Sequence, residues 1–184
     1  MRITHPVAMR FLLPLCALLG LFLSTGCANY QLGTSGKLSF RTLYISPVEN
    51  KAQLPQAVAV ITTQIREAFL RDGRVTLVNS PGEADATLHI TLVRYARDVA
   101  TARPDDTGLA RKFNLNLTAL CTLRKTQDNT VLLENRALAV EQQIFATATP
   151  QQADSDQLQA EYQALPQLAA TLADKVSHAA LDVW

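Results

Sequence analysis

Strict alternation of apolar and polar residues is the clearest pattern in the chain. It predicts a strand over 113–123, with one face formed by Phe113, Leu115, Leu117, Ala119, Cys121 and Leu123. A similar alternation over 84–95 predicts a second strand, and the run from 131 to about 144 predicts a third, which follows a hairpin turn at 127–129. Short apolar stretches at 43–45 and 75–78 predict two further strands. The polar segment 97–110 is typical of a long loop.

Two segments have the spacing of amphipathic helices. The first covers about 55–71, begins near Pro55, and is predicted to end at Gly73 in a left-handed cap. The second carries one apolar stripe, formed by Leu158, Tyr162, Leu165, Ala169, Leu172, Val176, Ala179 and Val183. Pro166 lies within this stripe and predicts a kink or a break just before it, because proline removes a helical hydrogen bond. Residues 147–157 are expected to form a loop.

The order of these elements indicates an α+β fold. Strands and helices are segregated along the chain, and each helix has a single apolar face to bury. We therefore predict a two-layer sandwich, in which two helices pack on one face of a mixed, mostly antiparallel sheet of four to five strands.

The N-terminus has the features of a lipoprotein signal peptide. Basic residues precede an apolar run over 11–23, which is too short to span a bilayer and leads into Leu23-Ser24-Thr25-Gly26-Cys27. We expect residues 1–26 to be removed, Cys27 to be lipidated, 27–39 to form a tether and 40–184 to form a single domain. An ordinary secretory signal with a coincidental cysteine is the alternative. Ala28 favours the outer membrane, because an aspartate there is typical of inner-membrane retention.

Charge and cysteine content narrow the class of protein. The leader holds two of the 17 Lys and Arg residues and none of the 16 acidic residues, so the remainder is nearly neutral at 15 against 16. This balance does not favour a nucleic-acid partner. After processing, Cys121 has no second cysteine inside the domain with which to form a disulfide, and it is predicted to be a buried apolar residue.

Candidate catalytic chemistry is sparse. His89 and His178 have no metal-ligand spacing with each other or with Cys121, and the chain has no glycine-rich phosphate loop or nucleophile elbow, so we predict neither an enzyme nor a bound cofactor or metal. One group of cations is a candidate binding site, because it gathers at the ends of two neighbouring strands: Arg94, Arg97, Arg103, Arg111 and Lys112. Arginine forks at such a place suit phosphorylated headgroups. The alternative is that Asp98, Asp105 and Asp106 neutralise these cations in a merely soluble loop.

Several short motifs, in this order, resemble the lipopolysaccharide-assembly lipoprotein family LptE. They are Cys27 with Tyr30-Gln31-Leu32-Gly33, the stretch from Thr42 to Asn50, Ala84-Asp85-Ala86-Thr87-Leu88 with Tyr95, and the terminal helix with Leu172-Ala173 and Trp184. The resemblance implies an outer-membrane lipoprotein that plugs the β-barrel protein LptD, assists its assembly and contacts lipopolysaccharide. It also implies a fold of two helices on a four-stranded sheet.

The resemblance also implies where the protein acts and what it binds. It places the body on the periplasmic side or inside the barrel lumen, held by the lipid on Cys27, with the barrel and lipopolysaccharide as partners. The competing hypothesis is an accessory envelope lipoprotein of another transport complex, without lipopolysaccharide contact. A general glycan-binding lipoprotein is less favoured, because Trp184 and a few tyrosines provide little aromatic platform.

Overall fold

The computed structural model describes residues 38–101, 110–147 and 153–182. The described strands are β1 (Thr42–Ile45), β2 (Glu49–Asn50), β3 (Thr76–Val78), β4 (Ala86–Thr101), β5 (Ala110–Lys125) and β6 (Val131–Thr147). The helices are α2 (Pro55–Asp72) and α3 (Ala153–Leu181), and a short 3-10 turn, η2, covers Pro81–Glu83.

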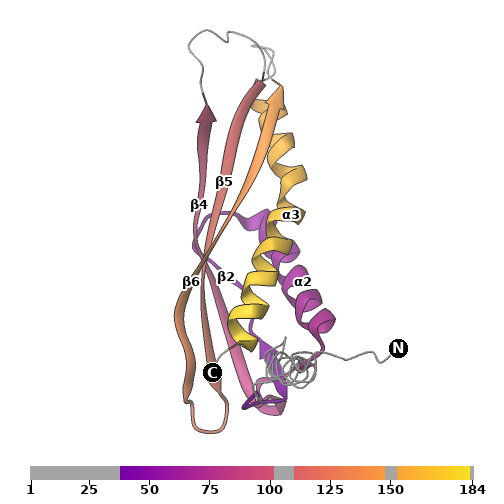
Figure 1. The fold of residues 1–184 in the computed structure, drawn as a ribbon, viewed down its shortest axis with the longest axis vertical. Coiled ribbons are helices and arrows are strands. Elements are labelled where there is room, and N and C mark those ends of the chain that lie inside the picture. Colours follow the sequence, from indigo (N-terminus) through magenta and orange to yellow (C-terminus); the bar gives the residue numbers. More distant parts are fainter. Residues whose placement is uncertain (1–37, 102–109, 148–152, 183–184) are drawn as a thin grey trace, which may run out of the picture. The chain divides into compact units, whose positions relative to one another are not determined.

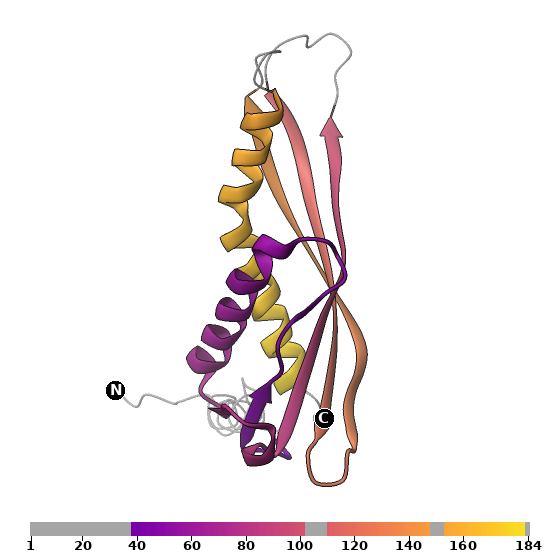
Figure 2. The same cartoon turned by 180° about the vertical axis from the view of Figure 1, so that it is seen from behind.

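The strands form one mixed sheet in the order β3-β1-β4-β5-β6, with β2 alongside β4 (Figure 1). β1 pairs in parallel with β3 and β4, whereas β4, β5 and β6 form an antiparallel meander. Both helices lie on the same face of this sheet, as Figure 2 shows from behind, so the predicted α+β sandwich is confirmed. The expected number of strands was too low, because the two polar residues of β2 pair with Thr91 and Leu92 without any apolar alternation to reveal them.

The core lies between the sheet and the two helices. All six alternating residues from Phe113 to Leu123 are buried, as predicted, and Cys121 is among them. Ile61, Ile65 and Phe69 of α2 and Leu168, Leu172 and Val176 of α3 are each 0–1% exposed. Burial of this kind stabilises the fold by about 1.5–3 kcal/mol for each large apolar side chain. The opposite face of the sheet carries no helix among the described residues, and we call it the open face.

The ends of α2 agree with the prediction, whereas α3 differs from it. Gly73 adopts φ 72° and donates its N–H to the Phe69 carbonyl at 3.1 Å, which is the expected left-handed cap. α3 begins at Ala153, inside the expected loop, and continues through Pro166 without the break that we considered. Pro166 is exposed, so water can bind the carbonyl that loses its partner, while buried Leu165 and Leu168 hold both flanks of the helix on the core.

β4 is longer than predicted. It reaches Thr101, which lies opposite Lys112, so residues 97–101 form a strand and not the start of a loop. The polar side chains in this stretch do not indicate a strand in the sequence, although the stretch pairs with β5 up to Thr101. The remainder of the expected loop, 102–109, lies outside the described residues.

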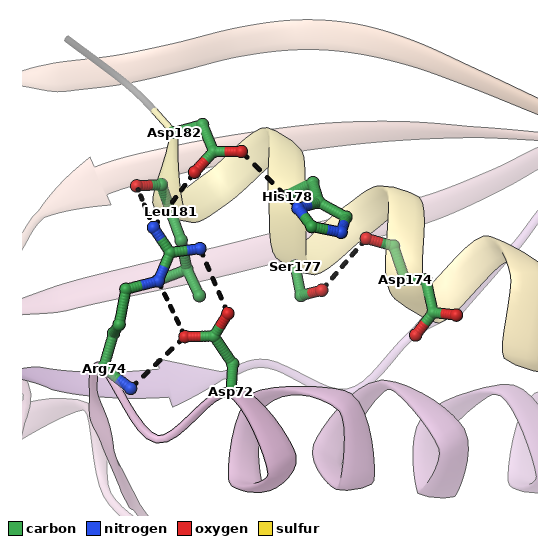
Figure 3. Close-up of polar contacts among 7 residues, drawn as sticks. All are labelled: Asp72, Arg74, Asp174, Ser177, His178, Leu181 and Asp182. Atoms are coloured by element: carbon green, nitrogen blue, oxygen red, sulfur yellow. Dashed lines mark hydrogen bonds and ion pairs between the residues drawn. The ribbon is translucent and has the colours of Figure 1, made fainter. Parts of the chain in front are cut away.

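A polar network joins the C-terminal ends of the two helices (Figure 3). The guanidinium of Arg74 donates to both carboxylate oxygens of Asp72 at 2.7 and 3.0 Å, and also to Asp182 at 3.0 Å and the Leu181 carbonyl at 3.4 Å. The hydrogen bond from Arg74 lowers the pKa of Asp72. His178 Nδ1 lies 3.5 Å from Asp182 on the solvent side. Arg74 therefore ties the last turn of α3 to the chain that leaves α2.

A second polar contact fixes β1 beside the start of β4. Asp85 Oδ2 accepts the backbone N–H groups of Arg41 and Thr42 at 2.8 and 2.9 Å, and the Thr42 hydroxyl in turn accepts the N–H of Asp85 at 2.8 Å. These hydrogen bonds lower the pKa of Asp85, with Arg41 the larger contributor. The parallel pairing of β1 with β4 thus has a side-chain anchor at its first residue.

Candidate functional site

The predicted cations of β4 lie on two faces of the sheet, and an irregularity in the strand decides which cation takes which face. Leu92 lies opposite Ala119 and Arg94 lies opposite Thr118, so Val93 is an extra residue at a β-bulge. Before the bulge, even-numbered residues point to the helices. After it, the odd-numbered residues do. Arg94 is consequently on the open face, while Arg97 lies opposite buried Leu115 on the helix side.

Arg97 belongs to a network around Glu161 of α3. The Glu161 side chain is only 12% exposed, and its carboxylate pairs with the Arg97 guanidinium and accepts the Tyr95 hydroxyl and the Gln157 amide, each at 3.1 Å. Burial raises the pKa of Tyr95, and the negative charge of Glu161 raises it further. Three donors thus stabilise a nearly buried carboxylate, and they hold the N-terminal half of α3 against β4.

On the open face, a ladder of amides lies between the remaining cations. Asn116 donates to Asp98 at 2.8 Å, and Gln143 donates to Asn114 at 3.2 Å across β5 and β6. Among the described residues these pairs place hydrogen-bonding groups in neighbouring rows on this part of the sheet. Such a surface is wet, and it offers donors and acceptors to hydroxyl and phosphate groups.

Arg94 and Lys112 are the two predicted cations that this face presents. Arg94 is exposed and makes no ion pair with another described residue. Lys112 Nζ lies 5.9 Å from the ring centroid of Phe145, directly across the strand pair, and Phe145 is 64% exposed. We call Arg94, Lys112 and Phe145 the loop-end site. Lys112 and Phe145 lie at the end where β4 and β5 are connected through residues 102–109, whereas Arg94 lies opposite Thr118, six residues from Lys112 along β5.

The structure brings together only part of the predicted group. Arg111 lies in β5 opposite Ala146, but its side chain is outside the described residues, as are Arg103 and Cys27 in full. The same holds for Asp105 and Asp106, whereas Asp98 forms its hydrogen bond with Asn116 and no described ion pair.

Sequence reasoning missed Glu161 and Phe145. The sequence signal for the bulge was available: apolar Leu92 and Val93 are adjacent and Tyr95 follows, which shifts the alternation by one residue. That shift predicts that Arg97 points to the helix side of the sheet, where an acidic residue of a helix is the expected partner.

The two histidines of the domain and Cys121 lie apart from the loop-end site. His89 is exposed on the open face near Ser46, His178 lies on α3, and Cys121 is buried, with a pKa raised to about 12 by that burial. Within residues 38–101, 110–147 and 153–182, no group of three or more His, Cys, Asp or Glu side chains is placed to hold a metal ion. No helix in that part of the chain combines the length and apolar character needed to cross a membrane.

Comparison with solved structures finds lipoproteins that are similar to this chain at low identity. A lipoprotein B of Nitrosomonas europaea is 17% identical, with 83% of this chain and 95% of that chain covered and a TM-score of 0.47. The rare lipoprotein B of Shewanella oneidensis is 12% identical (76% and 94% covered, TM-score 0.45), and a minor lipoprotein of Acinetobacter baumannii is 15% identical (76% and 94%, TM-score 0.44). A comparison with curated proteins gave no match.

The family is settled by a sequence match. A family model described as lipopolysaccharide-assembly matches residues 40–178 of the chain. This range runs from buried Phe40 to His178 in the last turns of α3, so it includes every described strand and all of α2. The protein therefore belongs to the LptE lipopolysaccharide-assembly family.

Proposed function

We propose that this protein is an outer-membrane lipoprotein, anchored through Cys27 after removal of residues 1–26, that plugs an LptD-type β-barrel, assists its assembly and takes part in lipopolysaccharide transport to the cell surface. Membership of the family over residues 40–178 is the observation that carries this proposal. A dry core between sheet and helices supports it, because a plug must be rigid. The open face supports it further, since amides and hydroxyls suit the polar lumen of a barrel.

The loop-end site is the part of the surface that we assign to lipopolysaccharide. Arg94 and Lys112 project from the open face, where their charges meet no described acidic partner within ion-pair distance. Phosphate groups of the glycolipid match such donors, and exposed Phe145 adds an apolar surface beside them. Arg97 does not belong to this surface, because it pairs with Glu161 and helps to hold α3 against β4. The assignment of Arg103 and Arg111 to lipopolysaccharide binding rests on the sequence alone.

The barrel partnership is tested by purification from outer membranes. The lipidated chain, solubilised in detergent, should come out with a large β-barrel protein in fixed stoichiometry, and mass spectrometry should find acyl chains on Cys27. An unmodified chain that is released from the membrane, or one that purifies alone, refutes the proposal. Purification with other transport subunits and without lipopolysaccharide binding would establish the accessory-lipoprotein alternative.

The lipopolysaccharide assignment is tested by substitution. The double variant R94A/K112A should bind lipopolysaccharide about tenfold or more weakly, because two charge-assisted contacts are lost. The matched control is K51A/R66A, which removes two cations from the β2–α2 connection and from α2. Equal loss in both variants would mean that overall charge, and not this site, governs the binding.

A further inference from the structure

A second group of cations lies at the other end of the open face. There β1, the start of β4 and the end of β5 enclose a hollow of about 360 Å³, whose walls include Tyr44, Thr87, His89, Arg124, Lys125 and Thr126. We call it the basal hollow. It lies beside the hairpin turn that joins β5 to β6, because Thr126 and Asn129 of that turn also line it. Tyr44, Thr87 and Arg124 stand in one row across three strands, since Tyr44 pairs with Thr87 and Thr87 with Arg124.

The basal hollow is built for an anion. No acidic side chain lines it, whereas an arginine, a lysine, a histidine and three hydroxyl groups do. Neither Arg124 nor Lys125 forms an ion pair with any described residue. Two nearby carboxylates have backbone partners: Asp85 accepts the N–H groups of Arg41 and Thr42, and Asp128 accepts the N–H of Thr130 at 3.0 Å. The hydrogen bonds from Thr130, and to a lesser extent the charge of Lys125, lower the pKa of Asp128.

His89 is oriented by its neighbour. The Ser46 hydroxyl lies 3.1 Å from the Leu88 carbonyl and 3.1 Å from His89 Nδ1. When the hydroxyl donates to that carbonyl, it must accept from His89, so Nδ1 carries the proton and Nε2 can accept a hydrogen bond from a hydroxyl or N–H group of a ligand. The side chain is exposed, so a ligand can reach Nε2 from the solvent.

The position of the hollow in the chain indicates which anion it meets. An adjoining hollow of about 310 Å³ shares Lys125 and is lined by Leu38, Ser39, Phe40 and Arg41, the first part of the described chain. Ten residues separate Leu38 from Cys27, and such a segment can span at most about 40 Å. A body anchored through Cys27 therefore keeps this end within about 40 Å of the lipid headgroups of its membrane.

We infer that the basal hollow binds the phosphate of a phospholipid headgroup in the membrane that carries the lipid anchor. The inference rests on the proposed anchoring at Cys27 for the source of the lipid, but not on the barrel partner or on lipopolysaccharide binding. Arg124 and Lys125 supply the charge, and the hydroxyls of Tyr44, Thr87 and Thr126 supply hydrogen bonds to phosphate oxygens. The contact orients the body on the membrane surface with its β5–β6 turn towards the headgroups.

The test uses residues 28–184 without the lipid, so that the anchor cannot mask a weaker contact. This part keeps every described element and the whole described core. Co-sedimentation is measured with phosphatidylglycerol vesicles and with phosphatidylcholine vesicles, and inorganic phosphate and purified lipopolysaccharide are added as competitors. We expect binding to phosphatidylglycerol, and a loss of about tenfold or more in R124A/K125A, whose thermal unfolding is checked against the parent chain.

Two controls separate this inference from the proposed function. R94A/K112A should lose lipopolysaccharide binding and keep vesicle binding, whereas R124A/K125A should do the reverse. Vesicle binding that is unchanged in R124A/K125A overturns the inference, whatever happens with the barrel. A loss of lipopolysaccharide binding in R124A/K125A, with vesicles still bound, would instead make the hollow part of the glycolipid site. Release of the protein from phosphatidylglycerol vesicles by inorganic phosphate would identify the hollow as a free-phosphate site and overturn the inference.

Discussion

We expect the packing of the N-terminal half of α3 against β4 to depend on the carboxylate of Glu161, and Glu161→Ala tests this. Glu161 is 12% exposed and is bonded to Tyr95, Arg97 and Gln157. The Tyr95 hydroxyl is half-buried, and a hydrogen bond to a charged group contributes about 1.5–3 kcal/mol. The Arg97 side chain is 45% exposed, so its ion pair adds only roughly 0.2–1 kcal/mol. We therefore expect Glu161→Ala to lower the free energy of unfolding by about 2–4 kcal/mol.

Urea unfolding of residues 28–184 measures this loss. The midpoint should fall while the slope with denaturant stays the same, because the surface exposed on unfolding hardly changes. Glu67→Ala is the matched control: Glu67 is an exposed helical carboxylate bonded only to Gln64 at 3.0 Å, and its loss should change stability by less than about 0.5 kcal/mol. A loss in Glu161→Ala no larger than that of the control would refute the argument.

A double-mutant cycle with Tyr95→Phe isolates the hydroxyl contact. The two substitutions together should cost less than the sum of their separate effects, by about 1–2 kcal/mol, because they share one hydrogen bond.

The contribution of Tyr95 to stability also depends on pH. Burial, followed by the charge of Glu161, raises the pKa of Tyr95 above its ordinary value of 10.0. The folded state therefore favours the neutral phenol, its contribution is complete below that value, and stability falls as the pH rises beyond it. Tyr95→Phe should make this fall shallower in unfolding midpoints measured between about pH 9 and 11.

Three further predictions concern the body of the fold. Leu172→Ala should cost about 2–5 kcal/mol in urea unfolding, since the side chain is 0% exposed, while Leu70→Ala, at 64% exposed, should change stability by less than about 0.5 kcal/mol. Gly73→Ala should cost about 1–2 kcal/mol because φ 72° strains any residue with a Cβ, whereas Gly82→Ala, which has no positive φ, should be nearly neutral; equal effects would contradict the cap. Asp85→Asn should flatten acid unfolding: the pKa of Asp85 is lowered, chiefly by Arg41, so its contribution is present above the ordinary value of 3.8 and is lost as the pH falls below it.

The sequence predicted the covered side of the sheet well because one physical signal dominates there. The buried face of the sheet takes apolar side chains, and every second residue from Phe113 to Leu123 is apolar for this reason. The end of α2 was equally predictable, since a left-handed position at Gly73 leaves a local mark in the sequence. These features depend on short stretches of chain, so no knowledge of distant partners was needed.

The candidate site was harder to predict because its geometry depends on partners far apart in sequence. Glu161 and Arg97 are 64 residues apart, and nothing local to either marks the pair. Arg94 and Arg97 are three residues apart on one strand and so point to opposite faces, and the bulge at Val93 turns Arg94 to the open face and Arg97 to the helix side. The helix through Pro166 shows the same limitation, because packing of both flanks on the core outweighs a local preference against helix.

The open face is polar along its length and presents cations at both ends and in the middle, where Arg94 lies opposite Thr118. Lys112 and Arg124 lie on the same strand, twelve residues apart, which corresponds to about 40 Å along β5. The apolar band of an outer-membrane barrel is about 25 Å tall, so a plug aligned with the barrel axis would place Lys112 and Arg124 beyond opposite edges of that band, with Arg94 between them. Lys112 and Arg124 are then too far apart to hold a single headgroup. The division fits two tasks: the loop-end site meets the transported glycolipid, and the basal hollow meets the leaflet that carries the anchor. Variants at the two ends should therefore fail independently, and a common failure would mean that the body does not lie along the barrel in this way.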